Sequence, residues 1–379
     1  MKIAVVILNW NTKDYLRRFL PPLLDSVSWF NAGETEDWAE VIVADSASAD
    51  GSIEMLSRDF PKVRRIPLDR NYGFTGGYNR ALKELSVNTA ETGTPDSARE
   101  LGSRGDFDLF ILLNSDIEVT QIWLRPLAEW MKSHPDCGIC GPKLHSWYER
   151  EKFEYAGAAG GLIDRFGYPF CRGRVLGKTE VDKGQYDSPA DVLWVTGACL
   201  VIRARLWDSL GGLDDRFFAH MEEIDLCWRM QLEGWKVMVV PDSVVYHLGG
   251  GTLPQNSPQK LYLNYRNNLL LLDNNLAQTI GKRRAGLRIL VRKILDGCSA
   301  AVYLLTLKPA YFKAVWRAHR DARMLIAEKR NDLQGAMGNG PRRQDSKTRS
   351  VIGIYDGCMI PRALLGMKIQ FRNPKDKTR

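Results

Sequence analysis

The sequence predicts an α/β fold built on a mainly parallel sheet, and three observations lead to this prediction. Short runs rich in β-branched residues alternate with stretches of helical periodicity through the first 85 residues. These strand-like runs are apolar throughout, as expected for strands covered by helices on both faces. Polar residues follow the carboxyl ends of successive strands, where open α/β sheets bind ligands. With 379 residues, 44% of them hydrophobic and 26% charged, the chain has material for two to three domains.

The elements predicted for the first third follow in order along the chain. Strands are expected at residues 2–8, 40–44, 63–67 and 109–113, and helices at 14–27, 50–60 and 76–85. Pro21 and Pro22 lie inside the first helical stretch, so we expect the helix to restart there. Asp50 is a suitable N-cap for the second helix. Residues 88–105 are polar and lack periodicity, which predicts a surface insertion before the fourth strand.

The middle of the chain is predicted to contain loops, hairpins, further strands and a helix. Residues 157–190 are rich in Gly, Arg and aromatic residues, a composition typical of loops and hairpins. Strand character is expected at 193–203, 237–240 and 244–247. Residues 222–233 have helical character and are followed by Gly234, a common residue just beyond a helix end.

The C-terminal part of the chain differs from the rest in charge. Residues 281–379 carry a net charge of +16, against −8 for residues 1–280. We expect a helix at 260–276 and then two basic amphipathic helices. In these, Leu287, Leu290 or Val291 and Ile294 recur opposite Arg288, Arg292 and Lys293, and Tyr311, Val315, His319 and Ala322 follow Pro309. Such helices dock on anionic membrane surfaces, and the alternative is a pair of helices packed on the body with their basic face in water.

These patterns divide the chain into three parts and indicate where it works. We predict a main domain at 1–278, a basic helical region at 279–335 and a basic, partly mobile tail at 336–379. The start of the chain does not resemble a secretory signal, and no stretch approaches the roughly 18 apolar residues of a membrane span. Seven cysteines, an odd number, fit a reducing compartment, and we interpret all of them as core or incidental residues. We therefore expect a cytoplasmic protein, peripheral on the inner face of the cytoplasmic membrane.

Four predicted strand ends carry small, amide or carboxylate residues. These are Asn9-Trp10-Asn11; Asp45 with Ser46, Ser48 and Asp50; Asn71 to Gly77 with its glycines; and Asn114-Ser115-Asp116. A carboxylate after the second strand can accept hydrogen bonds from a nucleobase or ribose, and glycines after the third let backbone N–H groups approach phosphate. Asp116 is a hard oxygen ligand suited to Mg²⁺ or Mn²⁺, although an Asp at a strand end is often only a turn cap.

Two further places carry candidate chemistry. Glu222, Glu223 and Asp225 lie at a loop-to-helix start, where one of them can act as a general base, or where all three stabilise a helix N-terminus. His247 precedes three glycines, which indicates a flexible loop or close approach to a ligand. The first strand is not followed by G-x-G-x-x-G, and the chain has no G-x-x-x-x-G-K-[ST], so a nicotinamide-binding domain and a P-loop nucleotidase are poorly supported.

Seven segments in order resemble the family 2 glycosyltransferases, and more narrowly their rhamnosyltransferase-like branch. They are N-W-N, V-A-D-S-A-S-A-D-G-S, R-N-Y-G-F-T-G-G-Y-N, L-L-N-S-D, W-V-T-G-A-C-L-V-I-R, E-E-I-D-L-C-W-R and V-Y-H-L-G-G-G-T. The resemblance covers about residues 1–275. It implies a GT-A fold, a nucleotide-sugar donor, a divalent metal and inversion at the anomeric carbon.

The resemblance also implies roles for individual residues. Asn11 and Asp45 would contact the nucleotide, Asn71, Gly73 and Asn79 would shape the donor pocket, and Trp194 and Gly197 would lie beside the donor sugar and acceptor. Asp116 matches the last carboxylate of the D-x-D metal motif, within a donor-side segment of Asn114, Ser115 and Asp116, and His247 matches the histidine that completes the metal site. Asn114 occupies the first D-x-D position. Glu223 matches the catalytic base, although Glu222 and Asp225 remain alternatives.

The leading hypothesis is a metal-dependent inverting glycosyltransferase in cell-surface polysaccharide assembly. It would use Mg²⁺ or Mn²⁺, move a rhamnose-like sugar from a dTDP- or UDP-sugar, and act on a saccharide or lipid-linked saccharide at an anionic membrane surface. The alternative is a catalytically silent module of the same fold that binds nucleotide sugar, which Asn114 favours. Nucleic-acid binding is not expected, because the sequence has no RNP, KH or zinc-finger pattern.

Overall fold

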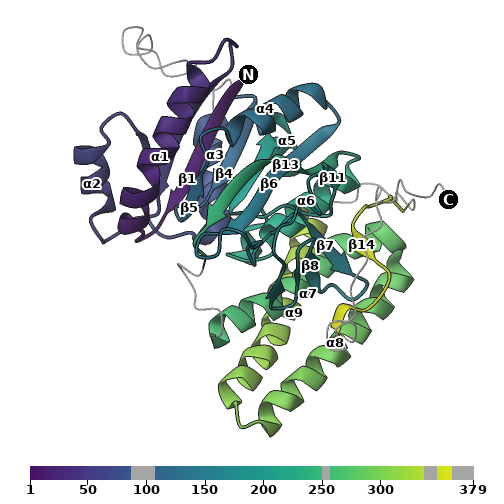
Figure 1. Cartoon of the computed structure of the whole chain (residues 1–379). Helices are drawn as coiled ribbons and strands as arrows, with labels where there is room; N and C mark the ends of the chain where they lie inside the picture. Colours follow the sequence, from purple (N-terminus) through teal and green to yellow (C-terminus); the bar gives the residue numbers. More distant parts are fainter. Residues whose placement is uncertain (87–106, 250–256, 337–347, 361–379) are drawn as a thin grey trace, which may run out of the picture.

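The computed structural model describes residues 1–86, 107–249, 257–336 and 348–360, and it shows a main sheet with helices on both faces (Figure 1). The strands of this sheet are β1 (Lys2–Asn9), β2 (Trp38–Asp45), β3 (Arg64–Pro67), β4 (Leu109–Leu113), β5 (Ile117–Val119), β6 (Cys137–Ser146), β11 (Ala190–Asp191), β12 (Cys199–Arg203) and β13 (Lys236–His247). The helices around it are α1 (Lys13–Asn31), α2 (Ser52–Asp59), α3 (Gly73–Ser86), α4 (Leu124–Ser133), α5 (Ala204–Leu210) and α6 (Glu222–Leu232). The predicted insertion at 88–105 lies outside the described residues.

The sheet has the strand order β11-β13-β6-β12-β4-β1-β2-β3, with β5 paired to β13. Strands β3, β2, β1 and β4 run parallel, as does β6 with β13, while β12 is antiparallel to both β4 and β6. In β1, Ile3, Val5 and Ile7 contact the core under α1, α2 and α4, and Ala4 and Val6 contact the core under α3. This burial on both faces is what the apolar runs predicted.

Helix α1 corrects one prediction, because it continues through Pro21 and Pro22 without restarting. Leu16 and Leu20 before the prolines and Leu23 and Val27 after them are all buried against the same side of the sheet. One continuous apolar face therefore outweighs the local cost of the prolines.

Two predicted strands also differ from the structure. Only Cys199–Arg203 of the segment 193–203 is a strand; residues 193–198 approach the site as a loop, with Trp194 bridged to Gly161. The segments 237–240 and 244–247 form one strand, β13, whose pairing with β6 shifts in register between Val240 and Val244. The residues between the two apolar segments thus form a bulge.

The segment 157–190 forms hairpins, as predicted. Their strands are β7 (Gly161–Asp164), β8 (Pro169–Cys171), β9 (Arg174–Val175) and β10 (Lys178–Thr179). Together with β14 (Ile354–Tyr355), these strands make a second sheet of order β10-β9-β8-β7-β14. Strand β14 belongs to the tail, most of which lies outside the described residues. Its parallel pairing with β7 ties this part of the tail to the body.

Three long helices complete the described chain: α7 (Pro258–Ile280), α8 (Lys282–Leu305) and α9 (Pro309–Ala336). Helix α7 packs on α6, and α8 and α9 form a hairpin that projects away from the main sheet (Figure 1). The boundary near residue 278 remains a prediction; the chain turns there at Gly281, between α7 and α8. Among the described residues, none of the helices combines the length and apolar character required to cross a membrane.

Candidate active site

The carboxyl ends of β1 and β2 form a polar corner around Asp45. The two strands pair with Asn9 opposite Asp45. Asn9 is buried and donates from Nδ2 to Asp45 Oδ2 at 2.6 Å, while the Ser48 backbone N–H donates to Asp45 Oδ1 at 2.8 Å. Asn11, at φ 54°, accepts the Ala49 N–H at 2.8 Å. The structure therefore brings Asn11 and Asp45 to the same corner of the sheet, and their contact with a nucleotide remains a prediction.

The end of β4 joins this corner from the other side of β1. The Thr12 hydroxyl lies 2.9 Å from the Ser115 hydroxyl, and β4 pairs directly with β1. Asn114 donates its backbone N–H to Ala198 O at 2.9 Å, next to Gly197. Three strand ends and the loop before β12 thus meet at one edge of the sheet.

Asp116, His247 and Glu154 form a buried charged cluster at the same edge. Strand β13 pairs with β5 so that His247 lies opposite Ile117. His247 Nε2 is 3.2 Å from Asp116 Oδ1, and His247 Nδ1 is 3.4 Å from Glu154 Oε1. Burial opposes the charge on His247, but the two carboxylates outweigh it and raise the pKa of His247 to about 10. Burial likewise acts against ionised Asp116, yet the charge of His247 keeps the Asp116 pKa below its usual value.

The donor atoms of this cluster fit part of a divalent-cation site. Asp116 supplies a carboxylate oxygen, the ligand type that Mg²⁺ and Mn²⁺ prefer, and His247 supplies an imidazole nitrogen once a bound cation displaces its proton. Within the described ranges, no three His, Cys, Asp or Glu side chains form a complete ligand set. A cation at Asp116 and His247 would therefore need oxygen ligands from a bound phosphate or water, which is common for Mg²⁺.

The loop before α6 has an unusual backbone. Phe218, His220 and Met221 all have positive φ, between 62° and 71°. Asn267 of α7 holds this loop: its Nδ2 lies 3.0 Å from Phe217 O and 2.7 Å from both Ala219 O and His220 O. Non-glycine residues in this conformation cost free energy and cluster at functional sites, so the loop marks a place where geometry is imposed.

Glu222 and Glu223 begin α6 directly after this loop, and both are withdrawn from solvent. Oε2 of each carboxylate has no hydrogen-bond partner among the described residues. Burial raises the pKa of Glu223 to about 7. Burial and the charge of Glu223 raise the pKa of Glu222 well above its usual range. A carboxylate with a pKa near neutrality and a free oxygen is suited to take up a proton.

Gly197 connects Glu223 to the strand-end corner. A Cβ placed on Gly197 would lie 3.5 Å from Glu223 Cβ and 3.2 Å from Phe74 Cζ. Ala198, the residue after Gly197, accepts the N–H of Asn114 at its carbonyl oxygen. Gly197 therefore lies between Glu223 on one side and Asn114 on the other. The structure thus brings together Glu223, Gly197 and the Asn114–Asp116 segment.

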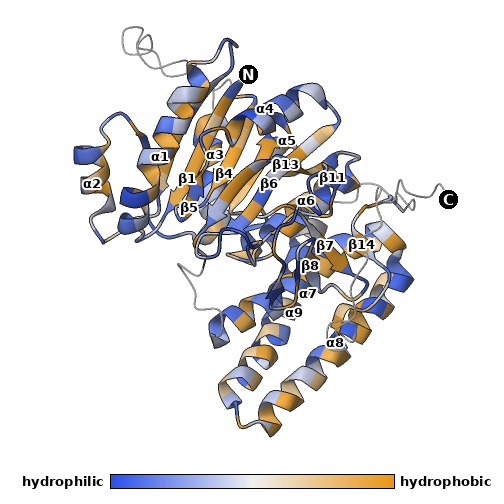
Figure 2. Ribbon diagram, in the orientation of Figure 1, coloured by the Kyte–Doolittle hydropathy of each residue, from blue (hydrophilic) through white to orange (hydrophobic). Residues whose placement is uncertain are grey.

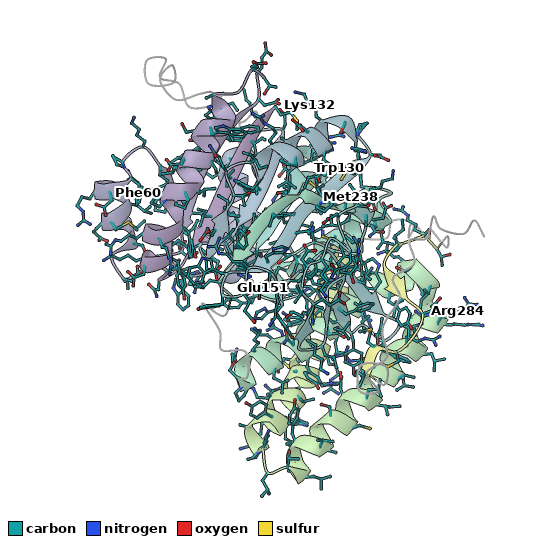
Figure 3. The ribbon with its side chains drawn as sticks, viewed as in Figure 1. Phe60, Trp130, Lys132, Glu151, Met238 and Arg284 are labelled. Carbon is teal, nitrogen blue, oxygen red and sulfur yellow. The ribbon has the colours of Figure 1, made fainter. Side chains whose placement is uncertain are left out.

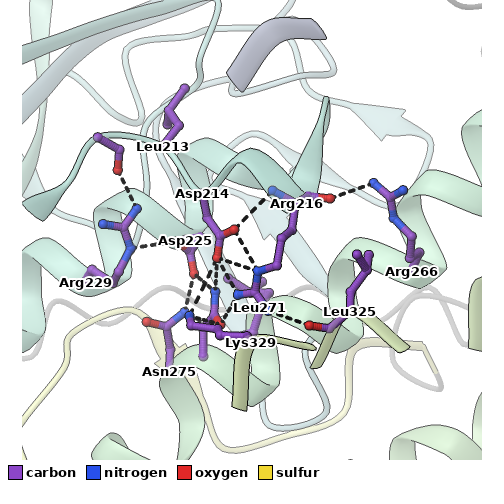
Figure 4. Close-up of polar contacts among 12 residues, drawn as sticks. Leu213, Asp214, Arg216, Asp225, Arg229, Arg266, Leu271, Asn275, Leu325 and Lys329 are labelled. Atoms are coloured by element: carbon purple, nitrogen blue, oxygen red, sulfur yellow. Dashed lines mark hydrogen bonds and ion pairs between the residues drawn. The ribbon is translucent and has the colours of Figure 1, made fainter. Parts of the chain in front are cut away.

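Asp225 is directed toward α7, where it contacts Asn274 and Asn275 (Figure 4). It is fully buried, and its Oδ2 accepts Arg229 Nε at 2.7 Å. Its Oδ1 accepts Nδ2 of Asn274 and of Asn275, each at 2.8 Å. Both oxygens are occupied, so the position of Asp225 favours a role in holding α6 on α7.

Four other predicted residues lie at varied distances from this edge. Gly73 has φ 70°, and a Cβ there would lie 2.5 Å from the Phe218 ring, so Gly73 packs on the loop before α6; Asn71 accepts its N–H at 2.7 Å. Asn79 instead exchanges hydrogen bonds with the backbone of Leu213. Trp194 is in the core, and its indole N–H donates to Leu162 O at 3.1 Å.

Two site residues escaped the sequence prediction. Glu154, beside His247, lies in a stretch without periodicity, and nothing in its neighbours indicates a site. Asn267 lies within the helix predicted at 260–276. The signal that could have marked it is an Asn within an apolar segment, because a buried Asn requires hydrogen-bond partners.

The polar strand ends of this α/β fold gather at one edge of its sheet, and comparison with known proteins places the chain in a family. The family model described as "Glycosyltransferase like family 2" matches residues 2–267. The chain therefore belongs to glycosyltransferase family 2, and its fold is the GT-A fold.

Curated relatives of the chain include two proteins named as rhamnosyltransferases. An N-acetylglucosaminyl-diphospho-decaprenol L-rhamnosyltransferase of Mycobacterium tuberculosis is 26% identical over 249 residues, covering 65% of this chain and 75% of that protein. The rhamnosyltransferase WbbL of Escherichia coli is 22% identical, covering 63% of this chain and 80% of that protein. Among solved structures, residues 1–349 of S. aureus TarS in complex with UDP-GlcNAc match with a TM-score of 0.51 at 15% identity, covering 86% of this chain and 83% of that one.

Proposed function

We propose that the protein is an inverting glycosyltransferase that moves a rhamnose-like sugar from a dTDP-sugar to a lipid-linked saccharide in cell-surface polysaccharide assembly. Membership of family 2 supports sugar transfer. The printed names of the M. tuberculosis and E. coli relatives support rhamnose as the sugar and, for the former, a diphospho-polyprenol acceptor. We infer a peripheral position on the inner face of the cytoplasmic membrane, which a lipid-linked acceptor of that kind supports.

The observation that carries the proposal is the position of Glu223. Its carboxylate combines a raised pKa, an oxygen without a partner among the described residues, and a place against Gly197 beside the Asn114–Asp116 segment. Asp225, by contrast, is occupied by Arg229 and α7. We therefore assign the base to Glu223 and treat Glu222 as a buried neighbour whose own pKa is raised by burial and by the charge of Glu223.

The nucleotide half of the donor is assigned to the corner at β1 and β2. Asp45 is fixed by Asn9 and Ser48, so its carboxylate is oriented before a ligand arrives. Asp116 and His247 would hold a divalent cation, which neutralises charge on the diphosphate as it leaves. Glu154, on the far side of His247, is placed to orient the imidazole through Nδ1.

The reaction proceeds by direct displacement at the anomeric carbon. The acceptor oxygen forms its bond to this carbon while the bond to the diphosphate oxygen breaks, and the bonding electron pair leaves with the nucleoside diphosphate. Glu223 takes the hydroxyl proton of the acceptor on the face opposite the leaving group, which inverts the configuration. Holding the two reactants in line supplies much of the rate.

A silent module that binds nucleotide sugar without transferring it is the second candidate, because Asn114 replaces the first carboxylate of the metal motif. A thermal-shift panel of dTDP-, UDP- and GDP-sugars with and without Mn²⁺ identifies the donor, since a ligand of the native state raises the melting temperature. We expect cation-dependent stabilisation by one dTDP-sugar, lost in Asp116→Ala and kept in the control Glu129→Ala on exposed α4. Binding without product from any acceptor would favour the silent module; no binding at all from folded protein would contradict both.

A further inference from the structure

Helix α8 is turned so that two of its charged residues, Arg292 and Asp296, face inward. Its buried side chains are Ala285, Arg292, Asp296 and Ala300, spaced at seven- and four-residue intervals along one face. Arg292 was predicted on a solvent-exposed basic face, and the structure corrects this because the guanidinium is 4% exposed.

A hydrogen-bonded network explains this burial. Arg292 Nε donates to Asp296 Oδ1 at 2.7 Å, and His319 Nε2 of α9 lies 3.1 Å from Asp296 Oδ2. Arg292 also donates to Asn268 of α7 and stacks over the Tyr168 ring at 4.0 Å. Because every partner lies on the inner side, the network fixes the rotation of α8 about its axis.

The opposite face of α8 is apolar and exposed. Its large side chains are Leu287, Leu290, Ile294, Val302 and Leu305, which are 55–82% exposed. They form a stripe from Leu287 to Leu305, which are 18 residue steps apart along the helix, a length of about 27 Å. At the turn beyond α8, Leu307 is 89% exposed. Of the 17 large apolar side chains that are strongly exposed in the described ranges, nine lie on α8, this turn and α9, and Figure 2 shows hydrophobic residues along the projecting hairpin.

Basic residues border this apolar stripe at both ends. Lys282, Arg283 and Arg284 precede it and are exposed, and Figure 3 shows Arg284 pointing away from the protein. Lys308 and Lys313 follow the turn and are exposed too. Residues 297–307 carry no charge. An uncharged apolar stripe between clusters of cations is complementary to a bilayer with anionic headgroups.

We propose that the outer face of α8, from Leu287 to Leu307, is a docking surface that lies in the interface of an anionic lipid bilayer. The helix rests parallel to the membrane plane, with its apolar stripe among the acyl chains and its flanking lysines and arginines at the headgroups. Such helices bind through buried apolar area together with electrostatic attraction, so both lipid charge and the stripe contribute.

This docking also orients the active site. Tyr265 of α7 lies 2.7 Å from Ser299 of α8, so the turn after α8 lies at the end where α7 begins. The negative charge of Glu154 acts on Lys260, in the first turn of α7, and Glu154 contacts His247. The end of the stripe at Leu305 and Leu307 is therefore on the side of the Asp116–His247 cluster. This orientation rests on the proposed function; membrane binding itself does not.

Vesicle flotation of the full chain tests the docking surface. The probes are phosphatidylcholine vesicles with and without phosphatidylglycerol, at low and high salt. The test variant is Leu290→Ser/Ile294→Ser/Leu305→Ser, and the matched control is Ile122→Ser, a 52% exposed apolar residue outside the hairpin. We expect wild type and control to float with anionic vesicles and the triple variant to lose at least about tenfold in binding, with an unchanged melting temperature.

Two outcomes would overturn the proposal. One is equal flotation of the triple variant and the wild type. The other is wild-type protein that ignores vesicles but self-associates in light scattering, with the triple variant monomeric; the stripe would then bind a second copy of the chain. A second variant, Arg283→Glu/Arg284→Glu, is expected to weaken binding to anionic vesicles alone, and equal losses on both vesicle types would contradict the electrostatic part. Because flotation needs no turnover, failure of the proposed transfer reaction leaves this result interpretable.

Discussion

Replacing Glu223 by glutamine is expected to stabilise the protein at alkaline pH while it removes activity. In the folded state, burial raises the pKa of Glu223 from its usual 4.5 to about 7. The folded protein therefore holds this proton more tightly than the unfolded chain does. The resulting stabilisation is complete below about pH 4.5 and is lost as pH rises through about 7, where the buried carboxylate must ionise.

The size of the effect follows from the same shift. A rise from 4.5 to about 7 corresponds to about 3 kcal/mol between the protonated and ionised forms. Glu223→Gln keeps the shape and cannot ionise, and it also removes the charge that raises the pKa of Glu222. We expect the variant to be more stable than wild type by less than about 1 kcal/mol near pH 5 and by about 3 kcal/mol near pH 8. Turnover falls by about 10²–10⁴-fold, the usual contribution of a general base.

The assay combines melting curves from pH 5 to 8.5 with steady-state transfer kinetics on the same preparations. Glu54→Gln, at an exposed position of α2, is the control and should change neither quantity. A melting difference that does not vary with pH, or a variant less stable than wild type at pH 8, would refute the burial argument. Near-normal turnover would refute the assignment of the base, whatever the melting curves show.

Three further substitutions separate structural from catalytic roles. Asp225→Asn breaks the ion pair with Arg229 and should lower the free energy of unfolding in urea by about 3 kcal/mol, while the folded fraction keeps its kcat. A loss of kcat larger than the loss of folded protein would indicate that Asp225 is the base. Asn267→Ala leaves three loop carbonyls without their donor, and we expect about 2–3 kcal/mol of destabilisation and a kcat that falls more than KM rises; unchanged kcat would show that the loop keeps its shape alone. Gly73→Ala places a Cβ 2.5 Å from the Phe218 ring at φ 70°, so we expect about 1–3 kcal/mol of strain and a raised KM for the donor. Wild-type stability and wild-type KM would show instead that the loop shifts to make room for the Cβ.

Much of the fold was predictable because β1, β2 and β4 are apolar on both faces and leave an unambiguous run in the sequence. The continuity of α1 through Pro21 and Pro22 was not, since it depends on packing between α1 and the sheet rather than on local propensity. Periodicity likewise located α8 but not its rotation. Arg292 faces inward because it donates hydrogen bonds there to Asp296 and to Asn268 of α7, and His319 of α9 contacts Asp296 in turn. The network therefore combines residues of three helices.

The candidate site was predictable where it follows the strands. Asn11, Asp45 and Asp116 stand at strand ends, and parallel pairing carries them to one edge. The sequence did not separate Glu223 from Asp225, because their spacing along α6 is compatible with either role; only the position of Arg229 and the α7 asparagines distinguishes them. Trp194 was expected beside the sugar and lies in the core, since residues 193–198 form a loop rather than a strand.

The most direct test of the account is transfer from dTDP-rhamnose to an N-acetylglucosaminyl-diphospho-polyprenol in the presence of Mn²⁺, followed by mass spectrometry and by NMR of the new linkage. The account predicts one added sugar with an anomeric configuration opposite to that of the donor, made by wild type and lost in Glu223→Gln. A product that retains the donor configuration, or equal product from Glu223→Gln, would contradict direct displacement assisted by Glu223.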